Sequence, residues 1–252
     1  MRKSNPGRAA QEPPITNRSL STPLPFVLVN MAMTGDGKIA TANRAVSSFS
    51  SRRDQEHLLE LRATVDAVMA GARTVDLNAV NLGPGVAKYR RLRLRRGLAA
   101  FNLRIIVSRT GSVNPKAHVF QRTFSPIIIL TTRRATADRL QRLRAVAAEV
   151  RICGAKEINF RSALRWLRRK WGVRRLVCEG GGELNDALFR AGLVHELHLT
   201  VCPRIFGGRI APTIADGLGA GTLTQAAQLE LLSARRYGDE MFLVYRALRR
   251  RG

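Results

Sequence analysis

A buried strand, a glycine turn and a helix follow one another around residues 177–184, which read VCEGGGEL. The strand is predicted over Leu176–Glu179 and the helix over residues 183–191, with three glycines between them. Glycines at such a turn let the backbone approach a ligand, and the N–H groups at a helix N-terminus bind phosphate. A turn without a ligand rarely needs three glycines, so the stretch favours a phosphate or pyrophosphate site. It matches neither the GxGxxG fingerprint nor a P-loop.

Glu179 occupies the carboxyl end of the predicted strand. Ligands of open α/β sheets bind outside the carboxyl ends of the strands, where a carboxylate is placed to orient a substrate or transfer a proton. The alternative is a solvated carboxylate that only hydrogen-bonds the glycine turn.

Short strands alternate with helices along the rest of the chain, which predicts an α/β fold: a mainly parallel central sheet with helices on both faces. The closing strands predict an antiparallel C-terminal edge. The Gly-, Pro- and Arg-rich stretch 80–102 predicts a long surface loop. The other predicted strands are Phe26–Met33, Asp66–Gly71, Leu103–Ser108, Pro126–Thr131, Val150–Cys153, Glu196–Val201 and Tyr237–Ala247. The other predicted helices are Ser51–Thr64, 135–148 and 159–172.

The chain has 252 residues, of which 45% are hydrophobic, as expected for a globular protein. We predict a disordered leader over residues 1–23, which are rich in proline and polar residues, and a single domain over residues 24–252. Three cysteines without a CxxC pair argue against a disulfide framework. No apolar run approaches the roughly 20 residues of a membrane span, and no secretory signal is visible, so a cytoplasmic protein is expected.

Basic residues are in large excess, with 43 Lys and Arg against 18 Asp and Glu and a net charge of +25. Such an excess is typical of proteins that bind polyanions, so nucleic acid is one candidate partner. The alternative is that arginine replaces lysine on solvated faces, as codon bias in a GC-rich genome produces. No nucleic-acid motif accompanies the clusters at 88–96, 165–175 and 246–251, and specific nucleic-acid binding is not expected.

Two further segments place candidate residues at strand ends. In residues 31–40, MAMTGDGKIA, a Gly-Asp-Gly turn precedes Lys38, a cation suited to an anionic or reacting group. In residues 69–75, MAGARTV, a strand ends at Gly71 and Thr74 follows near a predicted helix N-terminus. The four histidines lack a zinc-binding spacing, so no metal site is expected; His57 is placed on a helix surface.

Taken together, these segments resemble the reductase of riboflavin biosynthesis, the C-terminal domain of the bifunctional deaminase-reductase and its stand-alone relatives. Residues 30–41, 61–75, 179–185 and 202–213 carry the resemblance. It implies a dihydrofolate-reductase-like fold, NADPH as cofactor and a homodimer. It also implies reduction of the ribosylamino side chain of a pyrimidine 5′-phosphate to a ribitylamino chain.

The resemblance implies three groups of site residues. They are the catalytic residues Lys38 and Glu179, the substrate-binding residues Asn30, Ser51 and Arg62, and the NADPH-facing residues Gly71, Thr74, Ser108, Arg109, Gly180, Gly181 and Gly182. Ser108 and Arg109 are similar to positions that meet the adenosine 2′-phosphate, and Ser51 and Arg62 to positions that hold the substrate phosphate. Eleven helical residues span roughly 16 Å, so Ser51 and Arg62 cannot both hold one phosphate from an unbroken helix of a single subunit. Either the helix breaks early, or one of the two reaches a site shared with a dimer mate, or only one of them is a ligand. We favour Arg62, whose guanidinium binds phosphate bidentately.

One segment departs from the family pattern. Family members typically carry Asp-Asp-Pro, then Leu and Arg, after the equivalent of Thr74, whereas residues 78–85 read NAVNLGPG. In the family this segment borders the substrate and not the cofactor. An alternative function is therefore an NADPH reductase of the same fold acting on another pterin-like or pyrimidine substrate. A more distant alternative is a nucleic-acid-binding protein that retains the fold without catalysis.

Overall fold

The computed structural model describes residues 23–44, 49–77 and 79–248. The predicted leader, residues 1–23, lies outside the described residues except for Pro23. Among the described residues, no helix combines the length and apolar character needed to cross a membrane.

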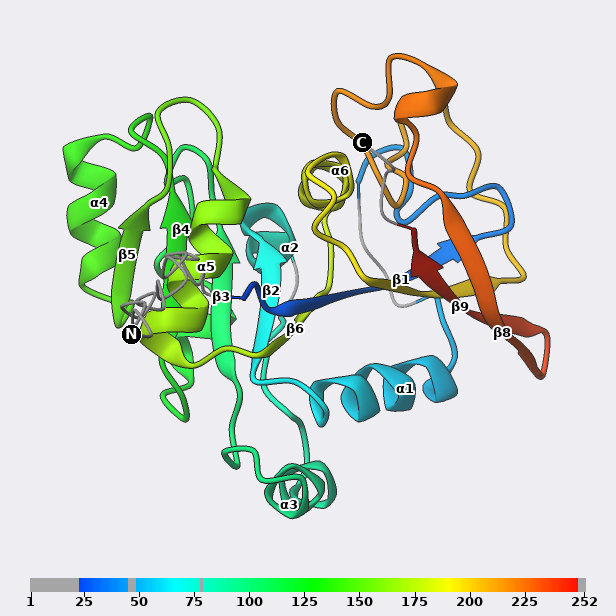
Figure 1. The fold of residues 1–252 in the computed structure, drawn as a ribbon, viewed down its shortest axis with the longest axis horizontal. Coiled ribbons are helices and arrows are strands. Elements are labelled where there is room, and N and C mark those ends of the chain that lie inside the picture. The colour runs from blue at the N-terminus through cyan, green and yellow to red at the C-terminus, as the bar shows by residue number, and fades with distance from the viewer. Residues whose placement is uncertain (1–22, 45–48, 78, 249–252) are drawn as a thin grey trace, which may run out of the picture.

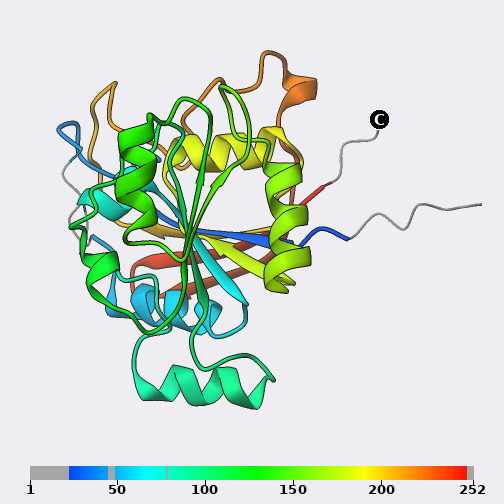
Figure 2. The same ribbon diagram turned by 90° about the vertical axis from the view of Figure 1, so that its left-hand side faces the viewer.

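A single nine-stranded sheet runs through the molecule in the order β5-β4-β3-β2-β6-β1-β7-β9-β8 (Figures 1 and 2). The first seven strands of this order, from β5 at the edge to β7, pair in parallel with their neighbours, and β9 pairs antiparallel with both β7 and β8. The predicted parallel sheet with an antiparallel C-terminal edge is confirmed. The strands are β1 Phe26–Thr34, β2 Ala67–Gly71, β3 Leu103–Val107, β4 Ile127–Thr131, β5 Glu149–Ile152, β6 Arg175–Cys178, β7 Glu196–Cys202, β8 Leu229–Tyr237 and β9 Glu240–Ala247.

Helices cover both faces of the sheet, as predicted. On one face, α5 and α6 bury Leu164 and Leu188 in the larger core. On the other, α1, α2 and α4 contribute Leu61, Val75 and Leu143 to a second core. The helices are α1 Arg52–Arg62, α2 Ala72–Leu77, α3 Ala87–Arg95, α4 Ala137–Arg144, α5 Phe160–Trp171 and α6 Gly182–Arg190, with 3-10 turns η1 His118–Gln121 and η2 Leu223–Gln225.

Three predicted helix ends are confirmed by their caps. The hydroxyl of Ser51 accepts a hydrogen bond from the backbone N–H of Asp54 at the start of α1, at 3.3 Å. Asn159 caps α5 in the same way. Gly172 ends α5 with φ +67°, in the left-handed region that glycine adopts without strain.

The prediction of a surface loop over residues 80–102 was wrong. This stretch contains α3, which projects below the sheet in Figures 1 and 2, and it buries Leu82, Tyr89 and Arg93. The sequence did not predict α3 because Arg93 occupies one of its buried positions, and this interrupts the apolar periodicity of a helix.

The C-terminal edge holds two strands where one was predicted over Tyr237–Ala247. β8 and β9 form a hairpin that turns at Gly238, with φ +59°. β8 is an edge strand whose residues are nearly all exposed, so it shows no alternation of apolar and polar residues.

Candidate active site

The carboxyl ends of β1, β2, β3 and β6 meet at one edge of the sheet, because these strands are parallel neighbours. Cys178, the last residue of β6, is in register with Val29 of β1 on one side and with Met69 of β2 on the other. Gly71 N–H donates to the carbonyl of Gly180 at 2.9 Å. The predicted glycine turn and the end of β2 are therefore in direct contact.

The three glycines of the turn are required for different reasons. A Cβ on Gly180 would lie 2.6 Å from Met31 Sδ, and one on Gly182 would lie 2.7 Å from the carbonyl oxygen of Thr213. Close packing therefore excludes side chains at both positions. Gly181 has φ +40°, and its nearest neighbour would be Thr74 Oγ1 at 3.7 Å. A side chain at 181 would thus point into the space beside Thr74.

The N-terminus of α6 opens onto the same space. Gly181 is the N-cap residue of this helix, and no side-chain hydrogen bond caps it among the described residues. The first backbone N–H groups of a helix lack intrahelical acceptors and carry partial positive charge. Together with Gly71 and Thr74, this arrangement fits the pyrophosphate of a dinucleotide.

Ser108 and Arg109 follow β3, next to β2 in the sheet. Ser108 is buried, with 4% exposure, and its backbone N–H donates to the carbonyl of Leu130. Arg109 is half-exposed, and its Nη1 lies 2.9 Å from Glu157 Oε1. An anionic ligand at Arg109 would compete with this carboxylate.

Lys38 is held by the turn that follows β1. Its backbone N–H donates to the Thr34 hydroxyl at 3.0 Å, and its Nζ donates to the carbonyl of Ala211 at 3.1 Å. Lys38 also forms a β-bridge with Thr213, whose carbonyl lies against Gly182. Residues 211–213 therefore connect Lys38 to the glycine turn.

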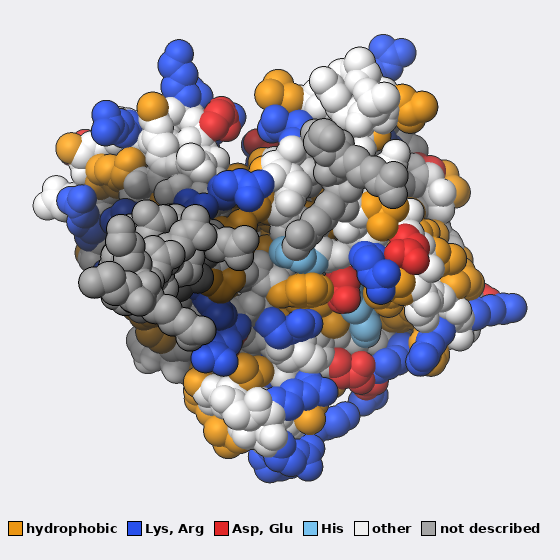
Figure 3. Space-filling model, in the orientation of Figure 1, with side chains coloured by type: hydrophobic (Ala, Val, Ile, Leu, Met, Phe, Trp, Pro, Cys, Tyr) orange, Lys and Arg blue, Asp and Glu red, His pale blue; other side chains and the backbone are white. Residues whose placement is uncertain are grey.

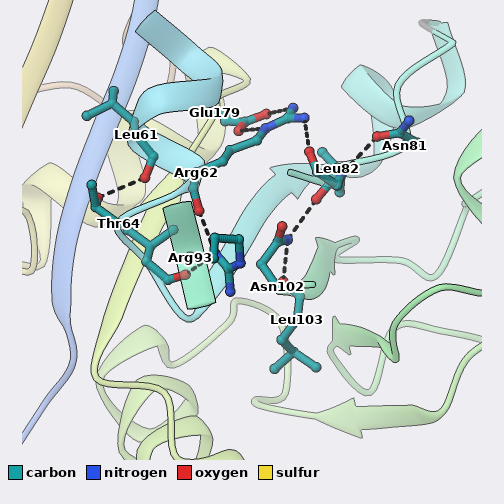
Figure 4. A network of polar contacts seen from close by, with 11 residues as sticks. Leu61, Arg62, Thr64, Asn81, Leu82, Arg93, Asn102, Leu103 and Glu179 are labelled. Carbon is teal, nitrogen blue, oxygen red and sulfur yellow. Dashed lines mark hydrogen bonds and ion pairs between the residues drawn. The ribbon is translucent and has the colours of Figure 1, made fainter. Parts of the chain in front are cut away.

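Arg62 and Glu179 form a buried bidentate ion pair (Figure 4). Arg62 Nε lies 2.5 Å from Glu179 Oε1, and Nη2 lies 2.6 Å from Oε2. Arg62 Nη1 donates to the carbonyl of Gly83 at 2.6 Å. The side chains of Arg62 and Glu179 are 8% and 10% exposed. The predicted phosphate contact of Arg62 would have to use the two N–H groups that remain of its five.

Ser51 lies beside a second buried carboxylate. The Ser51 hydroxyl donates to Glu240 Oε2 at 2.5 Å, and its backbone N–H donates to Oε1 at 2.7 Å. Glu240 is 5% exposed and also accepts from the thiol of Cys202. Its carboxylate therefore occupies the N-terminus of α1, where the predicted substrate phosphate would bind.

Asn30 presents an unsatisfied acceptor beside this edge. It follows Val29, the register partner of Cys178, and is 8% exposed. Its Oδ1 is buried and has no hydrogen-bond partner among the described residues. A buried amide oxygen without a donor is costly, so Asn30 suits a donor supplied by a ligand.

Sequence comparison assigns the chain to a family. The family model of the RibD C-terminal domain matches residues 25–243. This chain belongs to the RibD C-terminal domain family. It is 34% identical over 224 residues to the 2,5-diamino-6-ribosylamino-4(3H)-pyrimidinone 5′-phosphate reductase of Methanothermobacter thermautotrophicus, covering 88% of this chain and 97% of that protein. The reductase of the same name from Aquifex aeolicus is 33% identical, with 83% and 90% covered. The resemblance seen in the sequence is confirmed.

Solved structures share the fold of this RibD C-terminal domain. A pyrimidine reductase-like protein from Corynebacterium diphtheriae superposes with a TM-score of 0.74 at 20% identity, covering 89% of this chain and 92% of that one. RibD from Acinetobacter baumannii superposes with a TM-score of 0.70 at 17% identity, and the match spans 89% of this chain but 58% of that longer one. The predicted dihydrofolate-reductase-like fold is confirmed.

The loop of residues 78–85, whose sequence differs from the expected family pattern, contacts the Arg62–Glu179 ion pair through Gly83. Gly83 contributes the carbonyl bound by Arg62, and its N–H donates to Asn81 Oδ1 at 2.8 Å. Asn102 Nδ2 donates to the carbonyl of Leu82 at 2.8 Å. In this RibD-type chain the Gly83 carbonyl of the loop therefore helps to orient Arg62, and Asn102 holds the adjacent Leu82. Asn78, the first residue of the loop, lies outside the described residues.

Asp36 links two loops near Lys38, a contact that was not expected from the sequence. Its carboxylate accepts from the Thr34 hydroxyl and from the backbone N–H groups of Phe206 and Gly207, which lowers its pKa. Asp36 thus joins the Lys38 turn to the loop after β7. The Gly-Asp-Gly pattern marked the turn but gave no sign of the second loop.

His57 is half-buried, so its predicted place on a helix surface was wrong. Its Nε2 lies 3.3 Å from His198 Nδ1 on β7. On the other side of each ring, Glu60 Oε2 lies 3.9 Å from His57 Nδ1, and Glu196 Oε2 lies 3.4 Å from His198 Nε2. In the described part of the chain, no group of three or more His, Cys, Asp or Glu is arranged to hold a metal ion.

Lys and Arg side chains are spread over the face shown in Figure 3. They lie in several separate places, between hydrophobic and uncharged side chains. A continuous basic groove, which would follow a nucleic-acid backbone, is not visible on this face.

Proposed function

We propose that this chain reduces 2,5-diamino-6-ribosylamino-4(3H)-pyrimidinone 5′-phosphate with NADPH, as a step of riboflavin biosynthesis. The observation that carries the proposal is the position of Glu179. Its carboxylate is held by Arg62, and Gly180 to Gly182 follow directly in the chain. A group suited to the substrate and a turn suited to the cofactor are thus contiguous. The relatives at 33–34% identity carry this activity in their names.

In this proposal the cofactor lies along the carboxyl edge of the sheet. The N-terminus of α6, with Gly71 and Thr74, holds the pyrophosphate. Ser108 and Arg109 hold the adenosine 2′-phosphate, for which Arg109 exchanges its contact with Glu157. NADPH, when bound, supplies the hydride that reduces C1′ of the opened ribosyl chain.

The substrate is positioned by groups from α1, β1 and β6. Arg62 fixes the Glu179 carboxylate, whose remaining lone pairs accept hydrogen bonds from amino or hydroxyl groups of the substrate. Asn30 Oδ1 accepts a further donor. Lys38 places its ammonium at the end of β1, where it stabilises charge that changes on the substrate nitrogen. The protein contributes mainly position and electrostatics.

A reductase of the same fold with another pterin-like or pyrimidine substrate is the second candidate. The observation that favours it is the changed loop, whose Gly83 carbonyl contacts Arg62. Turnover decides between the two candidates: the purified protein is given NADPH with the diaminopyrimidinone phosphate, the corresponding aminouracil phosphate or a dihydropterin. We expect the highest kcat/KM with the diaminopyrimidinone phosphate. A higher value with the dihydropterin would establish the second candidate.

We also propose that the enzyme is a cytoplasmic homodimer. The free thiols of Cys153, Cys178 and Cys202 support a reducing compartment. The hairpin of β8 and β9 exposes several large apolar side chains, which supports self-association through this edge. They are Leu229, Leu231, Leu232, Tyr237 and Met241. Light scattering of the wild type and of Leu231→Lys tests the dimer, and a monomeric wild type would refute it.

A further inference from the structure

Arg93 of α3 is buried, and among the described residues no carboxylate forms an ion pair or hydrogen bond with it, although the charge of Asp66 acts on it from nearby. It is 1% exposed, and within the described part of the chain its guanidinium donates to three backbone carbonyls, those of Arg62 at 2.5 Å, Val65 at 2.7 Å and Ala99 at 2.8 Å. Burial lowers the pKa of Arg93 to about 10. The charge of Asp66 opposes this shift, but the hydrogen bonds of the buried guanidinium go to neutral carbonyls, whose positions it fixes.

Two of the three carbonyls that Arg93 binds, those of Arg62 and Val65, belong to the C-terminal end of α1 and the turn that follows it. Arg62 is the last residue of this helix, and the last carbonyls of a helix have no intrahelical donors and carry partial negative charge. Arg96 donates to the next carbonyl, that of Ala63, at 3.1 Å. Arg93 of α3 and Arg96, the C-cap residue of the same helix, therefore fix the end of α1 from which the Arg62 side chain extends.

Arg62 is held at both its ends as a result (Figure 4). Its backbone carbonyl accepts from Arg93, and its guanidinium binds Glu179 and the Gly83 carbonyl. A rotation of the last turn of α1 would displace the guanidinium and, with it, the Glu179 carboxylate. A displacement of a substrate-positioning group by about 1 Å is enough to slow catalysis strongly.

We propose that Arg93 is a positioning residue for the reduction: by capping the end of α1, it aligns Arg62 so that Arg62 presents the Glu179 carboxylate to the substrate. This inference rests on the proposed function. It gives α3, which projects from the sheet, a role at the site through its contact with the backbone of Arg62. Arg93 itself touches neither substrate nor cofactor in this account.

The experiment compares Arg93→Met with Arg91→Met, which changes an exposed arginine of the same helix. In Arg93→Met, KM for the phosphorylated pyrimidine rises at least about tenfold, and the Kd for NADPH stays within about twofold. Arg91→Met leaves both values within about twofold. If Arg93→Met behaves like Arg91→Met, the proposal is overturned.

A double-mutant cycle separates positioning from general destabilisation. Arg93→Met acts through Glu179 in this account, so in a Glu179→Gln background it changes KM by less than about twofold. Equal effects of Arg93→Met in both backgrounds would overturn the proposal. Arg93→Lys keeps a cation that can reach some of these carbonyls. Should Arg93→Met fail to fold, Arg93→Lys takes its place in the cycle. We then expect a smaller rise in KM in the wild-type background and, again, little further rise in the Glu179→Gln background.

A spectroscopic measurement makes the test independent of turnover. In protein labelled with ¹⁵N-arginine, the Nε–H of Arg62 gives a solvent-protected signal, assigned by its loss in Arg62→Lys. We expect this protection to fall in Arg93→Met or Arg93→Lys and to persist in Arg91→Met. Unchanged protection in the Arg93 variants would overturn the positioning role. Absence of wild-type turnover would instead refute the proposed function, and the signal would still decide whether Arg93 aligns Arg62.

Discussion

Arg62 and Glu179 are joined by two short hydrogen bonds, of 2.5 Å and 2.6 Å, although 117 positions separate them in the chain. The pair connects the last residue of α1 to the residue after β6, directly before the three glycines. The helix proposed to border the substrate and the turn proposed to border the cofactor are thereby fixed to each other.

Replacing Arg62 with methionine should destabilise the protein and weaken substrate binding. The change leaves the Glu179 carboxylate buried without its cation, so the free energy of unfolding should fall by about 3 kcal/mol. KM for the phosphorylated pyrimidine should rise at least about tenfold, with little change in NADPH affinity. Urea denaturation and steady-state kinetics measure the two effects.

The double variant Arg62→Met, Glu179→Met serves as the control. It removes both charges, so it should recover most of the lost stability, because apolar side chains of similar volume often replace a buried pair without loss. Substrate binding should remain weak. A single variant as stable as the wild type would mean that the pair is not buried in solution.

Gly181→Ala should reduce NADPH affinity at least about tenfold, because the new Cβ would point into the space proposed for the pyrophosphate. Gly192→Ala, at the other end of α6, is a matched control. Gly192 also has a positive φ, +62°, and open space around its Cβ position, so this variant shows how much binding is lost when a positive-φ glycine next to α6 is replaced away from the proposed pyrophosphate. Fluorescence titration measures the affinities. Equal affinities in the two variants would show that the turn is structural only.

Arg109→Ala should remove the preference for NADPH over NADH. We expect the wild type to prefer NADPH by about tenfold or more, since one charge-assisted contact contributes about 1.5–3 kcal/mol. Glu157→Gln removes the competing carboxylate, and because this pair is exposed it should raise NADPH affinity by less than about fivefold. A wild type that binds both cofactors equally would remove the assignment of Arg109.

Stability should decrease in mild acid because of His57 and His198. Burial lowers the pKa of both imidazoles below 6.5; their mutual repulsion adds to this for His57, and Glu196 opposes it for His198. The unfolded chain therefore binds more protons than the folded one as the pH falls below 6.5. Urea melts between about pH 7.5 and pH 5.5 should show the decrease. The double variant His57→Gln, His198→Gln should show a weaker dependence, and an unchanged slope would contradict this account.

Local sequence patterns predicted most of the elements. The run Ile127–Thr131 is apolar and rich in β-branched residues, and it forms β4. Ser51 and Asn159 cap the two helices that were predicted to begin at these residues. These features depend on neighbouring residues, so the sequence reveals them. The family motifs also pointed to the glycine turn and to Glu179.

The contacts that complete the site could not be predicted in this way. The Arg62–Glu179 pair depends on the order of strands in the sheet, which hydrophobic periodicity does not specify. Arg93 was assigned to a surface loop because arginine is rarely buried. Two of its acceptors, in Arg62 and Val65, lie 31 and 28 positions away, and backbone carbonyls leave no trace in a sequence. The contact between Glu240 and Ser51 was likewise not predictable, because 189 positions separate the two residues in the chain.

The most direct test of the proposed function follows the hydride itself. The purified protein is incubated with the diaminopyrimidinone phosphate and NADPH that carries deuterium at its hydride-donating carbon, and the product is examined by mass spectrometry and NMR. We predict a ribitylamino product with one deuterium at C1′, formed at a rate equal to NADPH oxidation. Oxidation of NADPH without deuterium at C1′, or no product at all, would contradict the account.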